Sequence, residues 1–112
     1  MSSAITPTDL GRLLKEKRDI LIIDVRRKSD YEASGEVIPG AVWRNPEKVD
    51  QWSKEFPQEK KVVIYCVRGG SVSKSVSARL LEAKVDVRYI EGGFSAWKDS
   101  GGEVKQKDAI SP

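Results

Sequence analysis

The single cysteine of the chain, Cys66, is followed by residues that suit a reactive thiol. It comes directly after the apolar run KVVIY and is followed closely by Arg68, Gly69 and Gly70. Two adjacent glycines allow a tight loop whose backbone N–H groups can all point inward, and such a loop stabilises an anion. The nearest candidate anion is the thiolate of Cys66 itself. The segment therefore predicts a nucleophilic cysteine.

The residues around Cys66 support this chemistry but also allow a purely structural interpretation. A helix that begins near Ser71 would add unpaired N–H groups and the positive end of its dipole. Arg68 could stabilise the thiolate or bind an anionic substrate. Alternatively, Cys66 only closes a buried strand, the glycines only make a turn, Ser71 only caps the helix and Arg68 is solvated surface.

The composition excludes several other kinds of catalytic site. The chain has 112 residues and no histidine, which removes Ser-His-Asp and Cys-His catalysis. One cysteine without histidine also argues against a zinc site and forbids an internal disulfide. No metal and no cofactor is implied. A nucleophile in this chain has to be activated by backbone dipoles or by cationic side chains.

Charge and hydropathy limit which partners the protein is expected to have and in which compartment it is expected to be. Twenty basic and 17 acidic residues give a net charge of +3, with both signs interspersed, so no nucleic-acid partner is expected. The beginning of the chain, MSSAITPTDL, lacks the pattern of a signal peptide, and the apolar runs are too short to span a membrane. We expect a cytoplasmic protein without membrane contact, in which a lone thiol stays reduced.

Helical and strand patterns alternate along the chain. The patterns predict helices over residues 5–17, 46–56, from about 71 onward, and 94–101, with a short helix or turn over 27–35. They predict strands over residues 19–25, 38–43, 61–66 and 85–91. The first helix should have Thr6 as its N-cap and Pro7 at its first position.

This alternation predicts the α/β class, with an open, mostly parallel sheet and helices on both faces. In such sheets ligands bind beyond the carboxyl ends of the strands, which is where Cys66 stands. We expect one domain over residues 1–101 and a polar C-terminal tail over 102–112.

Four motifs together resemble the rhodanese-like domains. They are IIDVR (22–26), SGEVIPGAV (34–42), the Cys66 loop and YIEGGFSAWKDSG (89–101), in the order that this family has them. The resemblance covers about residues 5 to 101. It implies a mostly parallel five-stranded sheet, helices on both faces, and a sulfurtransferase that holds sulfane sulfur on a loop cysteine.

The resemblance also implies a role for particular residues. Cys66 would be the catalytic nucleophile and become a persulfide. The substrate-binding residues, whose N–H groups would surround the outer sulfur, are Val67, Arg68, Gly69, Gly70, Ser71 and Val72. Structural positions of the family fall on Asp24, Arg26, Gly40, Gly92, Gly93 and Trp97.

Two positions depart from the family pattern. Val37 stands where many members have histidine, a position that belongs to the scaffold. Ser71 stands at the fifth position after the cysteine, where arginine is frequent, and Arg68 stands at the second. Because loop side chains set which donor fits, this change bears on substrate choice.

Three functions from different classes follow. The first is a sulfurtransferase that takes sulfur from a thiosulfate-like anion and passes it to cyanide, a thiol or a protein cysteine. The second is a phosphatase or arsenate reductase, which would need an arginine six residues after the cysteine, where Val72 stands. The third is a regulatory binding module, or a carrier of sulfur between proteins.

Overall fold

The protein folds around one parallel sheet. The computed structural model describes residues 3–16, 19–56, 61–68 and 70–106. Five strands form the sheet in the order β1-β6-β5-β2-β4, and every neighbouring pair is parallel. The strands are β1 Ser3–Ile5, β2 Ile20–Asp24, β4 Val42–Trp43, β5 Lys61–Tyr65 and β6 Asp86–Ile90. The predicted fold class is confirmed.

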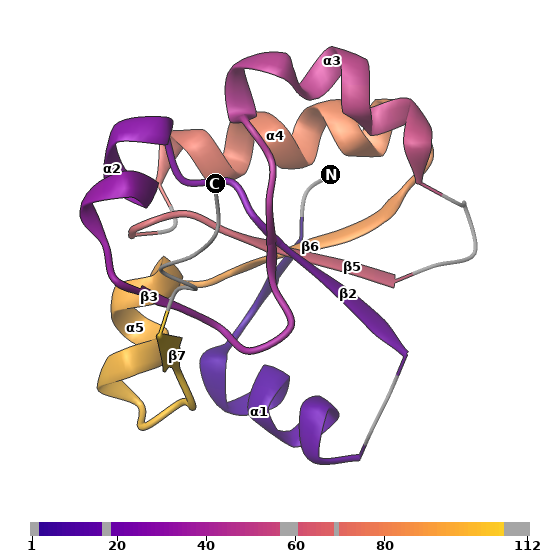
Figure 1. Ribbon diagram of the computed structural model, residues 1–112. Helices are drawn as coiled ribbons and strands as arrows, with labels where there is room; N and C mark the ends of the chain where they lie inside the picture. Colours follow the sequence, from indigo (N-terminus) through magenta and orange to yellow (C-terminus); the bar gives the residue numbers. More distant parts are fainter. Residues whose placement is uncertain (1–2, 17–18, 57–60, 69, 107–112) are drawn as a thin grey trace.

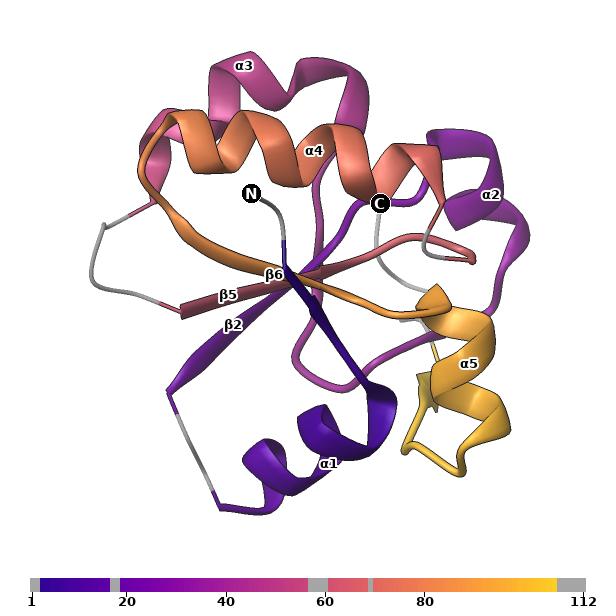
Figure 2. The ribbon, with the colours of Figure 1, turned by 180° about the vertical axis from the view of Figure 1, so that it is seen from behind.

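Helices cover both faces of this sheet. α3 (Val49–Trp52) and α4 (Ser71–Glu82) lie on one face, and α1 (Pro7–Lys15) and α5 (Gly93–Asp99) lie on the other (Figures 1 and 2). The carboxyl ends of β2 and β5 point to the side of the molecule that holds α2 (Lys28–Ala33) (Figure 1). This end of the sheet is the position expected for a ligand site.

Alternation along β5 divides the core into two apolar layers. Val62 and Ile64 pack with the α3 and α4 side, whereas Val63 and Tyr65 pack with the α1 and α5 side. Side chains of a strand point to opposite faces in turn, so a central strand that is covered twice needs apolar residues at every position. Cys66 continues this alternation and belongs to the layer under α4.

The beginning of α1 agrees with the prediction from sequence. Thr6 is the N-cap, its hydroxyl accepts a hydrogen bond from the N–H of Asp9 at 3.1 Å, and Pro7 follows at the first position. The prediction of one helix over residues 46–56 was too simple. This segment is a 3₁₀ turn (Pro46–Lys48), the single turn α3 and a second 3₁₀ turn (Ser53–Glu55).

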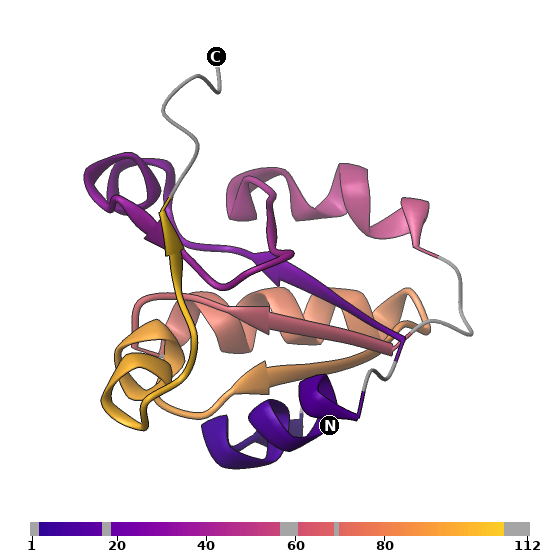
Figure 3. The same ribbon diagram turned by 60° about the horizontal axis from the view of Figure 1, so that its bottom comes forward.

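A second, two-stranded sheet joins distant parts of the chain. β3 (Glu36–Val37) pairs antiparallel with β7 (Lys105–Gln106) at the side of the molecule that holds α2 and α5 (Figure 3). The N–H of the Trp97 indole also donates to the carbonyl of Glu103 at 2.7 Å. Residues 107–112 of the predicted tail lie outside the described residues, and the domain boundary after residue 101 stays a prediction.

Candidate active site

Cys66 lies at the carboxyl end of β5 and lines a surface hollow. The hollow has a volume of about 320 Å³ and is lined by Arg26, Arg27, Asp30, Cys66, Val67, Arg68, Gly70, Ser71 and Val72. Cys66 is only 5% exposed. Cys66 therefore belongs both to the apolar core and to the lining of the hollow.

The first turn of α5 holds the loop that follows β5. The N–H of Phe94 donates to the carbonyl of Cys66 at 2.8 Å, and the N–H of Ser95 donates to the carbonyl of Val67 at 3.0 Å. In a planar trans peptide, the N–H points opposite to the carbonyl of the preceding residue. The N–H groups of Val67 and Arg68 are thus turned away from α5. No hydrogen bond among the described residues uses either of them as a donor.

The N-terminus of α4 forms another wall of the hollow. The helix begins at Ser71, and its N-cap residue is Gly70, so no side chain caps it. The first turn of the helix contains no acidic residue. The first N–H groups of a helix lack intrahelical partners and are attractive to anions. Ser71 and Val72 present this end of the helix to the same hollow as Cys66. Together with the loop, it offers a concave surface suited to an anion.

A buried ion pair supports the site from beneath. Arg26 lines the hollow but is only 2% exposed, and its Nε and Nη2 atoms donate to the carboxylate of Asp24 at 3.0 Å and 2.6 Å. The same Nη2 donates to the carbonyl of Glu36 at 3.0 Å. A buried charge of this kind is tolerable only when it is fully paired. Asp24 and Arg26 thus form a buried, paired unit, and the structural role that the resemblance implies for them stays a prediction.

Aromatic rings surround the Arg26 guanidinium and isolate it from solvent. Its Cζ lies 4.9 Å from the ring centroid of Phe94 and 5.7 Å from that of Tyr65. Burial alone would lower the pKa of Arg26, but the hydrogen bond and charge of Asp24 raise the pKa above its ordinary value. Burial, with the nearby Asp24 carboxylate, also raises the pKa of Tyr65. Tyr65 stays neutral and Arg26 stays charged.

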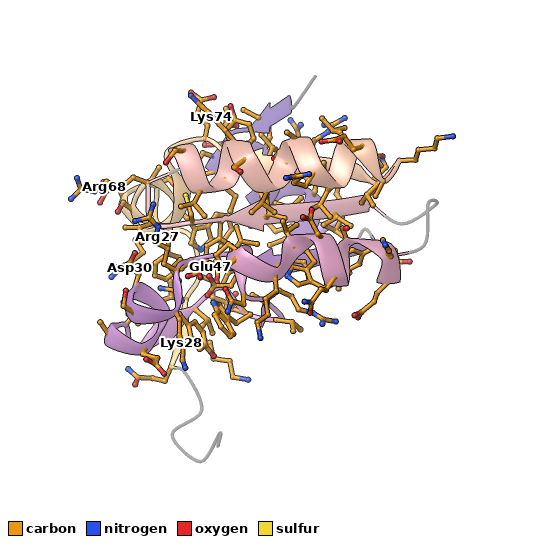
Figure 4. The ribbon with its side chains drawn as sticks, turned by 90° about the horizontal axis from the view of Figure 1, so that it is seen from above. Arg27, Lys28, Asp30, Glu47, Arg68 and Lys74 are labelled. Atoms are coloured by element: carbon orange, nitrogen blue, oxygen red, sulfur yellow. The ribbon has the colours of Figure 1, made fainter. Side chains whose placement is uncertain are left out.

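Three exposed charges stand on the rim of the hollow: Arg27, Asp30 and Arg68 (Figure 4). Within the described part of the chain, none of the three makes an ion pair. Arg68 points outward from the loop in Figure 4, whereas Arg27 lies between α4 and α2. Charges without a partner on the rim of a concave site are available to a ligand.

Most of the predicted site residues meet at this hollow. Cys66, Val67, Arg68, Gly70, Ser71 and Val72 all line it, and Gly69 lies outside the described residues. Their predicted roles in catalysis and substrate binding stay predictions. Sequence reasoning missed Arg27 and Asp30 as residues of the site. Both follow the buried strand β2, which is parallel to β5, Arg27 in the connection and Asp30 on α2, and this was the signal that could have indicated them.

Two negative findings concern only the residues that the structure describes. Over 3–16, 19–56, 61–68 and 70–106, no three His, Cys, Asp or Glu side chains gather as a metal site would require. Across the same ranges, every helix is too short or too polar to cross a membrane.

Comparison with known proteins identifies the class that this fold and site define. The profile of the family described as Rhodanese-like domain matches residues 6–100. The chain belongs to the rhodanese-like domain family. It is 40% identical over 86 residues to the thiosulfate sulfurtransferase GlpE of Coxiella burnetii, a match that covers 76% of this chain and 78% of that protein.

Two further relatives show how the family varies. The solved structure of a rhodanese-like domain protein from Staphylococcus aureus superposes with a TM-score of 0.77 at 29% identity, covering 95% of this chain and 100% of that chain. The dual specificity phosphatase ibp1 of Schizosaccharomyces pombe is 32% identical over 125 residues, covering 86% of this chain and 88% of that protein. Family membership therefore leaves the reaction to be decided at the site.

Proposed function

We propose that this protein is a sulfurtransferase that moves sulfane sulfur from an anionic donor such as thiosulfate to a thiophilic acceptor through a persulfide on Cys66. The observation that supports this most strongly is the position of Cys66. It lines a hollow bounded by the N–H groups of Val67 and Arg68, which have no acceptor among the described residues, by the N-terminus of α4 and by cationic side chains. Such surroundings suit both a thiolate and an incoming anion.

The first half-reaction loads the cysteine. The Cys66 thiolate attacks the outer sulfur of thiosulfate, a bond forms between Sγ and that sulfur, and the sulfur–sulfur bond of thiosulfate breaks. Sulfite leaves with the electron pair of the broken bond, and the outer sulfur, now bound to Cys66, keeps the negative charge that it had in thiosulfate. The N–H groups of residues 67–72 stabilise this charge, which makes them the substrate-binding residues of the proposal.

The second half-reaction returns the cysteine to its starting state. A nucleophile such as cyanide, a thiol or a protein cysteine attacks the outer sulfur, and the Sγ–S bond breaks with its electrons on Cys66. The two steps form a double displacement, so ping-pong kinetics are expected. A free thiol is required in each cycle, which a reducing compartment such as the cytoplasm maintains.

A phosphatase is the second candidate because of the relative named as one. Phosphoryl oxygens are best held by a planar guanidinium that donates two hydrogen bonds. The sixth position after Cys66 is Val72, and the arginines that reach the hollow are Arg26, which is already paired with Asp24, and the exposed Arg27 and Arg68. An aryl phosphate tests this candidate directly. Turnover that depends on Cys66 would favour it over sulfur transfer.

Intact mass after incubation with thiosulfate is the decisive experiment. We expect the reduced protein to gain the mass of one sulfur atom, to lose it again on reduction, and to show no gain in the Cys66→Ser variant. Sulfite should appear in equal amount. Absence of any gain with thiosulfate, mercaptopyruvate and polysulfide alike would leave a regulatory binding module as the better description.

A further inference from the structure

A second hollow adjoins the hollow that contains Cys66. Its volume is about 340 Å³, and it is lined by Arg27, Pro46, Glu47, Ser71, Val72, Ser75 and Val76. Arg27, Ser71 and Val72 line both hollows. The two therefore adjoin at the first turn of α4, next to the loop that carries Cys66.

The second hollow offers one charge of each sign. Arg27 and Glu47 are exposed and both line it, and among the described residues neither side chain takes part in an ion pair. The N–H of Glu47 donates to the side chain of Asn45 at 2.9 Å, which fixes the 3₁₀ turn that presents this carboxylate. A molecule that bears both charges would find a partner for each of them.

Uncharged groups make up the rest of this lining. The apolar part of the lining comes from Val72, Val76 and Pro46. The polar, uncharged part comes from Ser71 and Ser75 of α4. Small-molecule sites combine a mostly apolar surface with a few placed polar groups, and a volume near 300 Å³ is at the lower end of their usual range. The hollow is thus large enough for a small molecule.

We propose that the second hollow binds the sulfur acceptor, and that this acceptor is a small thiol carrying both a carboxylate and an ammonium group, as an amino-acid thiol does. Arg27 receives the carboxylate and Glu47 receives the ammonium. This inference rests on the function proposed above, because an acceptor is needed only if Cys66 is loaded with sulfur.

The transfer step balances without any further reactant. The acceptor thiol gives its proton to the persulfide anion, and the resulting thiolate attacks the outer sulfur and forms a new sulfur–sulfur bond. The bond between that sulfur and Sγ of Cys66 breaks, and its electron pair stays on Sγ. The products are the acceptor's hydropersulfide and the Cys66 thiolate, ready for the next donor.

Separating the two half-reactions tests the proposal. The full-length protein is loaded with thiosulfate, freed of excess donor, and then mixed with one of four thiols. Cysteine carries both charges, 3-mercaptopropionate only the carboxylate, cysteamine only the ammonium, and 2-mercaptoethanol neither. Loss of the added sulfur is followed by intact mass, and each rate is divided by the thiolate concentration because the thiols differ in pKa.

We expect cysteine to be the fastest acceptor, by about four- to 25-fold over 2-mercaptoethanol, since it makes two exposed ion pairs and each contributes at most about 1 kcal/mol. Arg27→Gln should slow the two acceptors with a carboxylate by about two- to fivefold and spare cysteamine. Glu47→Gln should slow the two acceptors with an ammonium and spare 3-mercaptopropionate. Lys28→Gln and Glu32→Gln are matched controls, because these side chains line neither hollow.

The possible failures are distinct. If wild-type protein never gains sulfur from a donor, the proposed function is wrong and this inference falls with it. If loading is normal but all four thiols react equally, or both variants slow every thiol alike, the inference alone is wrong. Fast transfer to a protein cysteine with slow transfer to all four thiols would overturn it in favour of a protein acceptor.

Discussion

Two adjacent arginines at the end of β2 show opposite uses of the same side chain. Arg26 is buried, is paired with Asp24, and lies against the rings of Phe94 and Tyr65. Arg27 is exposed, lines both hollows and makes no ion pair within the described residues. One guanidinium is therefore buried against the core, and the other is exposed at the rim of the hollow.

The difference in burial between Arg26 and Arg27 indicates which charges a ligand can use. Removing a buried charge from its partner leaves the partner uncompensated, whereas an exposed charge is solvated whether or not a ligand is bound. The buried set around Arg26 (Asp24, Arg26, Tyr65 and Phe94), called the floor below, therefore serves stability and the shape of the loop. The rim (Arg27, Asp30 and Arg68) is free to select substrates.

The largest expected effect is a loss of stability when a residue of the floor is replaced. Arg26→Ala leaves the Asp24 carboxylate buried without a cation, and we expect the free energy of unfolding to fall by about 3 to 5 kcal/mol. Urea denaturation followed by tryptophan fluorescence measures the change. Arg27→Ala is the matched control and should stay within about 0.5 kcal/mol of wild type. Equal losses in the two variants would show that the distinction between floor and rim is wrong.

A smaller loss of stability is expected from a substitution at Gly92, the residue that precedes α5. Gly92 has φ +77°, and a Cβ atom there would lie 2.5 Å from Cβ of Ala96. Gly92→Ala should therefore destabilise the protein by about 1 to 3 kcal/mol. It should also slow the loading of Cys66, because the next residues of α5 hold the loop through its carbonyl groups.

Gly11→Ala is the control for this substitution. Gly11 lies inside α1, where an added Cβ meets nothing within 4 Å, so alanine should stabilise the helix by about 0.5 to 1 kcal/mol without changing the loading rate. Thermal unfolding of both variants gives the comparison. A tolerated Gly92→Ala with wild-type loading would mean that the first turn of α5 does not position the loop.

The smallest effect is expected on the rim. Asp30 is the one acidic residue among those described around the Cys66 hollow, and its charge opposes an anionic donor. Asp30→Asn should raise the second-order rate of loading by thiosulfate by about two- to fivefold at low ionic strength and by less at high salt. Glu32→Gln, also on α2, should leave this rate unchanged. A slower rate in Asp30→Asn would mean that the carboxylate assists the donor.

Long apolar strands and well-capped helices were predictable because their signals are local. The runs at β2, β5 and β6, the Thr6–Pro7 cap and the beginning of α4 at Ser71 were all found from sequence. β1 was not, because three residues are too few to show a period. The pairing of β3 with β7 joins residues far apart in the chain, and no local pattern predicts such a contact.

The site was predictable where its residues follow each other in the chain. The loop from Cys66 to Val72 is a single segment, and its glycines and helix start can be identified directly. Arg27, Asp30 and Glu47 come from other segments, which only the parallel pairing of β2 with β5 and the packing of α3 on α4 bring near the loop.

By itself, the sequence determined the α/β class, the place of Cys66 at a strand end and the exclusion of histidine chemistry, because each depends on residue type and near neighbours. Only the tertiary structure decided which charges are paired. Burial and pairing are properties of the assembled core, and they separate Arg26, locked to Asp24, from Arg27, which stays available at the junction of two hollows.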